Sequence, residues 1–179
     1  MTGVSDATAD WECIGESPGV HRVTGWRNIA LIAWQGRPTG PATRQLASIT
    51  DHLLGQLDAG TKLSYIHLVP VGLGLPDADG RAALHEITQK HGQNTACVGV
   101  VVSGGGFWAS AVRGIVTSVQ VIAPRSVEMR IHAKSVELFS WFPREHEQRT
   151  GVSIPWSELT RPIDQAEAWQ RASILAHTG

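Results

Sequence analysis

Three apolar runs, each about the length of a buried β-strand, alternate with segments of helical periodicity, and this alternation limits the possible folds. The runs are Asn28–Trp34, Leu63–Val71 and Thr95–Val102. Nearly continuous apolar residues are typical of strands that are covered on both faces. The segment after the first run instead has apolar residues every three or four positions, at Ala42, Leu46, Ile49, Leu53 and Leu57. Strands that alternate with helices predict a mostly parallel sheet with right-handed crossovers.

An additional strand-like run, Val20–Thr24, precedes the first apolar run. Gly25–Arg27 separates the two, as in a hairpin with a short loop. The hairpin adds an antiparallel pair, so the expected fold is a mixed α/β sheet. The remaining expected elements are helices at 42–57, at 81–91 and after Gly104–Gly106, a strand at 127–132 and a short helix at 135–142. Residues 119–123 fit either a longer third helix or an edge segment.

Pro143 is expected to end the short helix, because proline cannot continue a helix interior. The charged segment 143–153 is expected to be a loop, followed by a last helix at about 164–175. Trp156, Ile163 and Trp169 are too apolar for a free tail. We therefore expect an N-terminal segment at 1–19, a domain at 20–142, and a C-terminal extension at 143–179 that packs on the sheet or across a twofold dimer interface.

Composition excludes several classes of protein. The formal charge is -1, from 15 basic and 16 acidic residues without a long run of either sign, so no nucleic-acid partner is expected. No stretch approaches the roughly 20 apolar residues of a membrane span, and the first residues lack a signal-peptide pattern. We expect a cytoplasmic protein. Cys13 and Cys97 form no CxxC pair and are expected to be structural thiols, and neither a metal site nor a cofactor is predicted.

The order of the expected elements, with a hairpin first and a polar turn before the second helix, resembles the STAS domain, named after sulfate transporters and anti-sigma-factor antagonists. The resemblance covers about residues 20–142. The chain is more specifically similar to small STAS-like proteins of myxobacteria and their relatives, at Gly106-Phe107, Ala111–Arg113 and Arg130–Glu137. This resemblance implies a STAS-like mixed sheet and a regulatory or protein-interaction role without catalysis.

In STAS antagonists that act as phosphoswitches, an Asp-Ser-Ser/Thr-Gly motif at the start of the second helix carries the phosphorylated serine. The matching positions here are Asp77, Ala78, Asp79 and Gly80. Neither Ala78 nor Asp79 can form a phosphate ester, so the resemblance implies a module without the serine switch. Asp79 could imitate a fixed negative charge, although one carboxylate carries less charge than a phosphate. The simpler alternative is that Asp77 or Asp79 caps the helix.

The patterns that could support catalysis are incomplete. The glycines at 104–106 could bind phosphate at a helix start, but no Lys-Ser or Lys-Thr follows, and Ala109 occupies the last glycine position of GxGxxG. A structural turn is therefore predicted. Ser103 lacks the preceding glycine of a nucleophile elbow, because Val101 stands there. His67 has no obvious partner for acid–base chemistry, so we expect no enzyme and no catalytic residue.

Two classes of function remain open. A protein partner could dock at the start of the second helix, where the candidate residues are Leu75, Asp77, Asp79, Gly80, Arg81 and Arg113. Arg113 is the candidate to pair with Asp77 or Asp79, or to face the partner. The alternative is a sensor or carrier of a small molecule, such as a nucleotide or lipid, with a pocket near Trp34, Gly104, Gly105, Phe107 and Trp108 that Leu75 could also line. A third possibility, an enzyme that acts on phosphorylated substrates, is supported only by the glycine turn.

Overall fold

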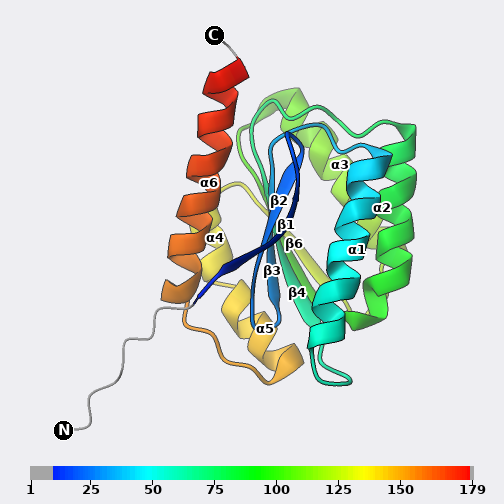
Figure 1. The fold of residues 1–179 in the computed structure, drawn as a ribbon, viewed down its shortest axis with the longest axis vertical. Helices are drawn as coiled ribbons and strands as arrows, with labels where there is room; N and C mark the ends of the chain where they lie inside the picture. Colours follow the sequence, from blue (N-terminus) through cyan, green and yellow to red (C-terminus); the bar gives the residue numbers. More distant parts are fainter. Residues whose placement is uncertain (1–9, 178–179) are drawn as a thin grey trace, which may run out of the picture.

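A computed structural model describes residues 10–177 of the chain and the side chains of residues 10–172 (Figure 1). It has one six-stranded sheet with the strands in chain order: β1 (Glu12–Ser17), β2 (His21–Trp26), β3 (Ile29–Trp34), β4 (Leu63–Val69), β5 (Thr95–Val102) and β6 (Glu128–His132). The strands β1 to β3 are antiparallel, and β3 to β6 are parallel. The expected mixed α/β sheet with an N-terminal hairpin is confirmed.

The hairpin turn is shorter than expected. Trp26 pairs with Ile29, so Arg27 and Asn28 form the turn, and Arg27 has a φ of 52°. Strand β1 was not expected, because it lies at the sheet edge and has no apolar run. It is held instead by backbone pairing to β2, with an irregularity between Cys13 and Gly15. Residues 1–9 of the expected N-terminal segment lie outside the described residues.

Three helices cover one face of the sheet: α1 (Gly40–Gln56), α2 (Ala78–His91) and α3 (Gly106–Ile122) (Figure 1). A short 3-10 turn, η1 (Gly92–Asn94), follows α2. Thr39 caps α1, with its hydroxyl accepting from the Ala42 N–H at 3.4 Å. The α3 helix runs to Ile122, so residues 119–122 continue the helix.

Three further helices cover the opposite face: α4 (Ser135–Phe139), α5 (Phe142–Thr150) and α6 (Ser157–His177) (Figure 1). The expectation of a loop after Pro143 is wrong. Pro143 lies in the first turn of α5, where its missing N–H needs no intrahelical partner. Gly151, with a φ of 74°, ends that helix.

The last helix begins at Ser157, earlier than expected, and contains Pro162. A proline inside a helix leaves the carbonyl four residues earlier without its usual donor. That carbonyl belongs to Glu158, and it accepts from Trp11 Nε1 at 3.2 Å. A side chain from the N-terminal end of the described chain therefore satisfies the group that Pro162 leaves unpaired. Sequence periodicity could not reveal this compensation.

The C-terminal extension lies on the sheet. Ile154, Leu159 and Ile163 belong to the buried core of the α4–α6 face. Farther along α6, Gln170 Nε2 donates to the carbonyls of Trp34 at 2.6 Å and Leu68 at 2.9 Å. The helix is therefore fastened to the carboxyl ends of the two central strands.

Candidate functional site

The helices α2 and α3 bury little of their surface against the sheet. The buried residues of α2 are Gly80, Ala83 and His91, and those of α3 are Ala109 and Val112. Two adjoining cavities, each of about 120 Å³, lie between these helices and the sheet. The residues that line both cavities are His67, Leu84, Val98, Val119 and Met129. We take this apolar space as the candidate site and call it the helix-side cavity.

Strand β4 supplies two polar side chains to the helix-side cavity. Tyr65 and His67 are two positions apart, so both project from the same face of the strand. Trp34 on β3 lines the cavity beside them, and its Nε1 donates to His67 Nδ1 at 3.1 Å. Since Nδ1 accepts, the neutral imidazole carries its proton on Nε2. No side chain or backbone group among the described residues accepts from that N–H.

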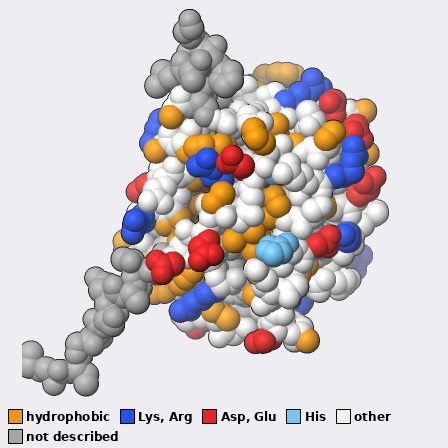
Figure 2. Space-filling model, viewed as in Figure 1, with side chains coloured by type: hydrophobic (Ala, Val, Ile, Leu, Met, Phe, Trp, Pro, Cys, Tyr) orange, Lys and Arg blue, Asp and Glu red, His pale blue; other side chains and the backbone are white. Residues whose placement is uncertain are grey.

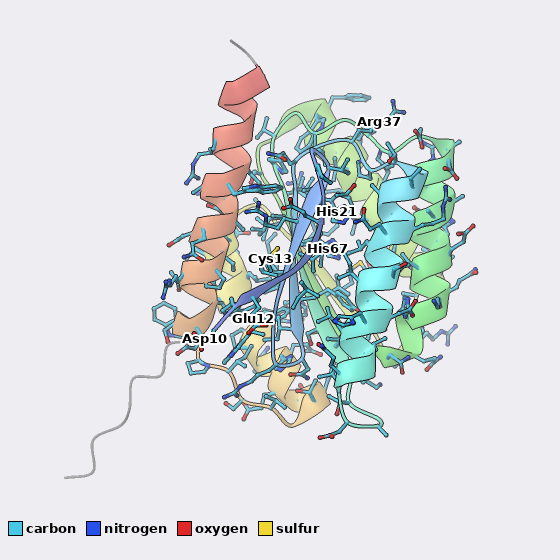
Figure 3. The ribbon with its side chains drawn as sticks, in the orientation of Figure 1. Asp10, Glu12, Cys13, His21, Arg37 and His67 are labelled. Carbon is cyan, nitrogen blue, oxygen red and sulfur yellow. The ribbon has the colours of Figure 1, made fainter. Side chains whose placement is uncertain are left out.

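Burial keeps two histidines neutral at this site. The pKa of His67 is lowered from 6.5 to about 4 by burial, and then by the nearby His21. His21 packs edge-on against Trp34, with 5.3 Å between ring centroids, and burial lowers its pKa to about 4. Figure 3 shows His21 and His67 close together on the sheet beneath α1. At neutral pH, His67 is therefore a hydrogen-bond donor without a charge.

The far end of the cavity is also polar. Tyr65 is 8% exposed, and its hydroxyl has no partner with hydrogen-bond geometry among the described residues. The hydroxyls of Thr50 and Thr95 lie beside it. Burial raises the pKa of Tyr65 to about 12, so this phenol remains protonated. The end of the cavity thus offers an unused donor.

One more imidazole lines this end, that of His91. Its Nε2 lies 3.6 Å from Asp51 Oδ1. The pKa of His91 is lowered, because the effect of burial exceeds that of the Asp51 carboxylate. No Lys, Arg, Asp or Glu is among the described residues that line the two cavities. The cavity can therefore bind and orient an uncharged molecule, whereas it lacks a charged group to stabilise an ion.

The loop between β4 and α2 forms the outer end of the cavity. Leu73, Gly74, Leu75 and Pro76 line it, and Leu75 is 37% exposed. Trp108 on α3 holds this loop, because its Nε1 donates to the Leu73 carbonyl at 2.7 Å. The same loop continues directly into α2, whose cap is Asp77. The residues at the outer end of the cavity therefore directly precede the start of α2 in the chain.

The structure separates the residues that were expected to form a pocket. Trp34 lines the helix-side cavity, and so does Leu75. Gly104, Gly105, Phe107 and Trp108 are not among its lining residues. Phe107 is 90% exposed and points outward, and Gly104 lies against Val71. The pocket lies deeper under α2 and α3 than the glycine turn suggested, because apolar α3 residues farther along the helix, including Val112, Val116 and Val119, face the sheet.

The residues that were expected to contact a partner at the start of α2 include several charged side chains with local polar contacts. Asp77 caps the helix, with its carboxylate accepting from the Gly80 N–H at 2.7 Å. Arg81 donates to the Pro76 carbonyl at 2.8 Å. A Cβ on Gly80 would collide with the Pro38 carbonyl, so glycine permits the close approach of α1 and α2. Arg37, labelled in Figure 3, lies 4.0 Å from Asp77.

Asp79 pairs with Arg44 on α1, and not with Arg113 as the sequence suggested. The Arg44 guanidinium donates to both carboxylate oxygens, at 3.0 and 2.9 Å. This hydrogen bonding lowers the pKa of Asp79 and raises that of Arg44. Arg113 lies partly buried in α3. No sequence pattern indicated this contact, because Arg44 and Asp79 are 35 positions apart on separate helices.

A second polar cluster lies under the opposite helices. Ser64 Oγ and His146 Nδ1 are 2.8 Å apart, and Cys97 Sγ lies 3.4 Å from the same hydroxyl. This spacing is that of a nucleophile and a base, but Ser64 and His146 are both 0% exposed. Burial also raises the pKa of Cys97 to about 12. The cluster therefore connects β4, β5 and α5. Cys13, in contrast, is exposed, so the expectation of a structural thiol does not extend to it.

Figure 2 shows acidic and basic side chains interspersed on the visible face, without a continuous region of either sign. Within residues 10–177, no group of three or more His, Cys, Asp or Glu side chains could hold a metal ion. No described helix is long and apolar enough to span a membrane. Comparison with family models, curated proteins and solved structures found no match to this chain. The fold and site define a mixed α/β protein with an apolar cavity under two helices.

Proposed function

We propose that this protein is a non-catalytic, STAS-like regulatory module that binds a small apolar molecule in the helix-side cavity. The observation that carries the proposal is an apolar space with two polar groups at its sheet wall. Tyr65 Oη is buried without a partner in hydrogen-bond geometry, and His67 Nε2 is the ring nitrogen that Trp34 does not occupy. Ligand sites are typically apolar cavities with a few convergent polar groups. Because no Lys or Arg is among the described residues that line the space, a lipid-like molecule suits it better than a nucleotide.

The same site supports a route from ligand to partner. The loop at Leu73–Pro76 contributes to the cavity and leads into the Asp77 cap of α2. A bound molecule would favour one conformation of this loop. It would thereby also affect the surface that follows the loop, as far as Arg81. We place the protein in the cytoplasm, without a nucleic-acid partner or a cofactor, and with a second copy or another protein as the partner.

A second candidate function is the docking of a protein partner at the start of α2 and the loop before it, without any small molecule. It is favoured by exposed apolar side chains near the carboxyl ends of the parallel strands: Val71, Leu75 and Phe107 are 60%, 37% and 90% exposed. Exposed apolar side chains grouped in this way are a mark of interaction sites. An enzyme is disfavoured, since Ser64 and His146, which have the spacing of a nucleophile and a base, are both buried in the core.

Benzene binding followed by methyl NMR tests the cavity. An engineered cavity of roughly 150 Å³ is known to bind benzene, which makes it a suitable probe. We expect saturable shifts of the Val98 and Val119 methyls, which line the cavity, and no shift of Val101 on the opposite sheet face. Val98→Phe should fill the space and abolish binding. Absence of saturable binding to the unaltered protein, or equal shifts at Val101, would contradict the proposal.

Affinity capture from the native cytosol tests the surface, with Asp79→Lys and Arg113→Glu as the altered proteins. Leu75→Asp removes an exposed apolar contact, and Val98→Phe alters only the cavity. If ligand and partner are coupled, Val98→Phe should change partner recovery as well. If docking is independent of a ligand, the surface variants alone should change it. Unchanged recovery of partners with all four variants would contradict the assignment of this surface as a docking site.

A further inference from the structure

Two hydrogen-bond donors on β4 face the helix-side cavity and have no protein partner. The Tyr65 hydroxyl is buried and has no partner with hydrogen-bond geometry, although the hydroxyls of Thr50 and Thr95 lie beside it. Trp34 occupies Nδ1 of His67, so the Nε2–H of that ring is available to a ligand. The two rings lie 6.4 Å apart between centroids, at an angle of 34°. A buried polar group without a hydrogen-bond partner is unfavourable, so a molecule that supplies an acceptor here gains an interaction that the described residues do not supply.

We infer that the ligand of this cavity is an uncharged, largely apolar molecule with a carbonyl or hydroxyl oxygen that accepts hydrogen bonds from Tyr65 Oη and His67 Nε2. This inference rests on the proposed function, and it names the chemical class of the ligand. Most of the remaining lining is apolar and includes Leu46, Val98 and Val119, while Thr50, Thr88, His91 and Thr95 add uncharged polar groups.

The charges around the site exclude an anion. No basic side chain is among the described lining residues, and both donors are neutral. The Asp51 carboxylate lies 3.6 Å from His91 Nε2 and would repel a negative group at that end. A carboxylate or phosphate would lose its hydration without gaining a counter-ion. An uncharged oxygen needs only the two donors that are present.

The volume limits the size of the ligand. Each of the two adjoining cavities measures about 120 Å³, somewhat less than the engineered cavity that accepts benzene. They meet at His67, Leu84, Val98, Val119 and Met129, so one molecule can extend from one cavity into the other. A ring with a short branch, or a short aliphatic chain, has the right dimensions.

Acetophenone, cumene and benzoate test the inference, because they share one skeleton and the same number of non-hydrogen atoms. Acetophenone has a neutral carbonyl, cumene has no polar atom, and benzoate is an anion. Dissociation constants are measured by methyl NMR on the full chain and on Tyr65→Phe and His67→Phe. His85→Phe, a substitution on α2 of a residue outside the cavity lining, is the control. Circular dichroism verifies that each variant is folded.

We expect each of Tyr65→Phe and His67→Phe to weaken acetophenone binding roughly tenfold, the usual net value of one hydrogen bond. Cumene binding should be unchanged or stronger, and benzoate should bind at least roughly tenfold more weakly than acetophenone. His85→Phe should alter none of these constants. Tyr65→Phe keeps the ring of tyrosine, so it remains informative even if His67→Phe, which removes the acceptor of Trp34, is unstable.

The other outcomes separate this inference from the proposed function. If the variants weaken cumene and acetophenone equally, the cavity binds apolar molecules but the assigned donors are wrong. If benzoate binds most tightly, the exclusion of anions is wrong. If only one variant discriminates, the role of the other residue is overturned. If neither acetophenone nor cumene binds the unaltered protein, both the inference and the proposed function fail.

Discussion

The two faces of the sheet are packed differently. On the α4–α6 face, Leu138, Phe142 and Leu159 are fully buried, and their side chains fill the space against the strands. On the α1–α3 face, α1 packs tightly, but α2 and α3 leave the helix-side cavity. Native interiors are normally as dense as organic crystals, with few voids larger than water. The loosely packed face is therefore the one on which a ligand has room.

Small differences along one strand produce this contrast. On β5, Gly99 faces the α4–α6 side, where a Cβ would collide with Leu138, so the glycine lets that helix approach the sheet. Val98 and Val100 face the other side and line the cavity. Adjacent residues of one strand therefore pack into a filled face and line a cavity on the other face.

The largest expected difference comes from shortening one leucine on each face. Leu138→Ala should lower the free energy of unfolding by about 3–5 kcal/mol, because it opens a cavity in a filled region. Leu84→Ala should cost only about 1 kcal/mol, because Leu84 is partly exposed and already borders empty space. Urea denaturation of the two variants measures both values. Equal losses would mean that the two faces are packed alike.

Acid should weaken both faces. Burial lowers the pKa of His21, His67 and His146 to about 4 in the folded protein, whereas histidine in an unfolded chain titrates near 6.5. The unfolded chain then binds more protons between these values, so stability falls as the pH drops from about 6.5 to about 4. A shift of this size corresponds to on the order of 3 kcal/mol for each histidine.

Denaturation at several pH values checks this effect, and the variants locate it. His67→Phe on the cavity face and His146→Phe on the opposite face should each reduce the pH dependence. The dependence should vanish above about pH 7, where the histidines are neutral in both states. A stability that stays constant between pH 7 and pH 4 would show that these imidazoles are not buried in their neutral form.

Enlarging one valine on each side of β5 gives a smaller difference. Val101→Leu should cost about 1–3 kcal/mol, because Val101 is 2% exposed in the filled core. Val98→Leu should be tolerated, since the added carbon can enter the cavity. Thermal denaturation compares the two. If Val98→Leu were as destabilising as Val101→Leu, the two faces of β5 would not differ in packing.

The smallest effects are expected at the start of α2. Asp77→Ala removes a helix cap and should cost about 1 kcal/mol, while Asp77→Asn keeps an accepting side-chain oxygen and should cost less. Asp79→Asn should change stability less than Asp77→Ala, because both side chains of the Asp79–Arg44 pair are at least half exposed. Urea denaturation ranks the three variants, and a reversed order would show that Asp79 has a structural role.

Much of the fold was predictable because it depends on local patterns. The run Thr95–Val102 is one buried strand with the predicted bounds, and the apolar period after Pro41 is helix α1. Strand β1 was missed because an edge strand can form by backbone pairing without an apolar run. The start of α6 was missed because its internal proline is compensated by Trp11, a residue distant in sequence. Local patterns cannot report such distant partners.

The candidate site was predicted only in part. Trp34 and Leu75 were expected to line a pocket, and both line the helix-side cavity. Tyr65 was not singled out, although alternation in β4 places it on the same face as His67. The hydrogen bond from Trp34 to His67 and the pairing of Arg44 with Asp79 join separate elements. Neither contact follows from spacing along the chain. Phe107 was assigned to the pocket on its proximity to the glycine turn, but its side chain points outward.

The sequence by itself determined the alternation of the central strands and helices, the mixed sheet and a cap at Asp77 or Asp79, because each depends on the periodicity or chemistry of neighbouring residues. The tertiary structure decided where the chain leaves space. A cavity exists only when whole helices stand away from a sheet, and their distance depends on contacts such as Gly80 with Pro38 and Trp108 with Leu73. Those contacts join residues that are far apart in the chain, so no local pattern encodes them.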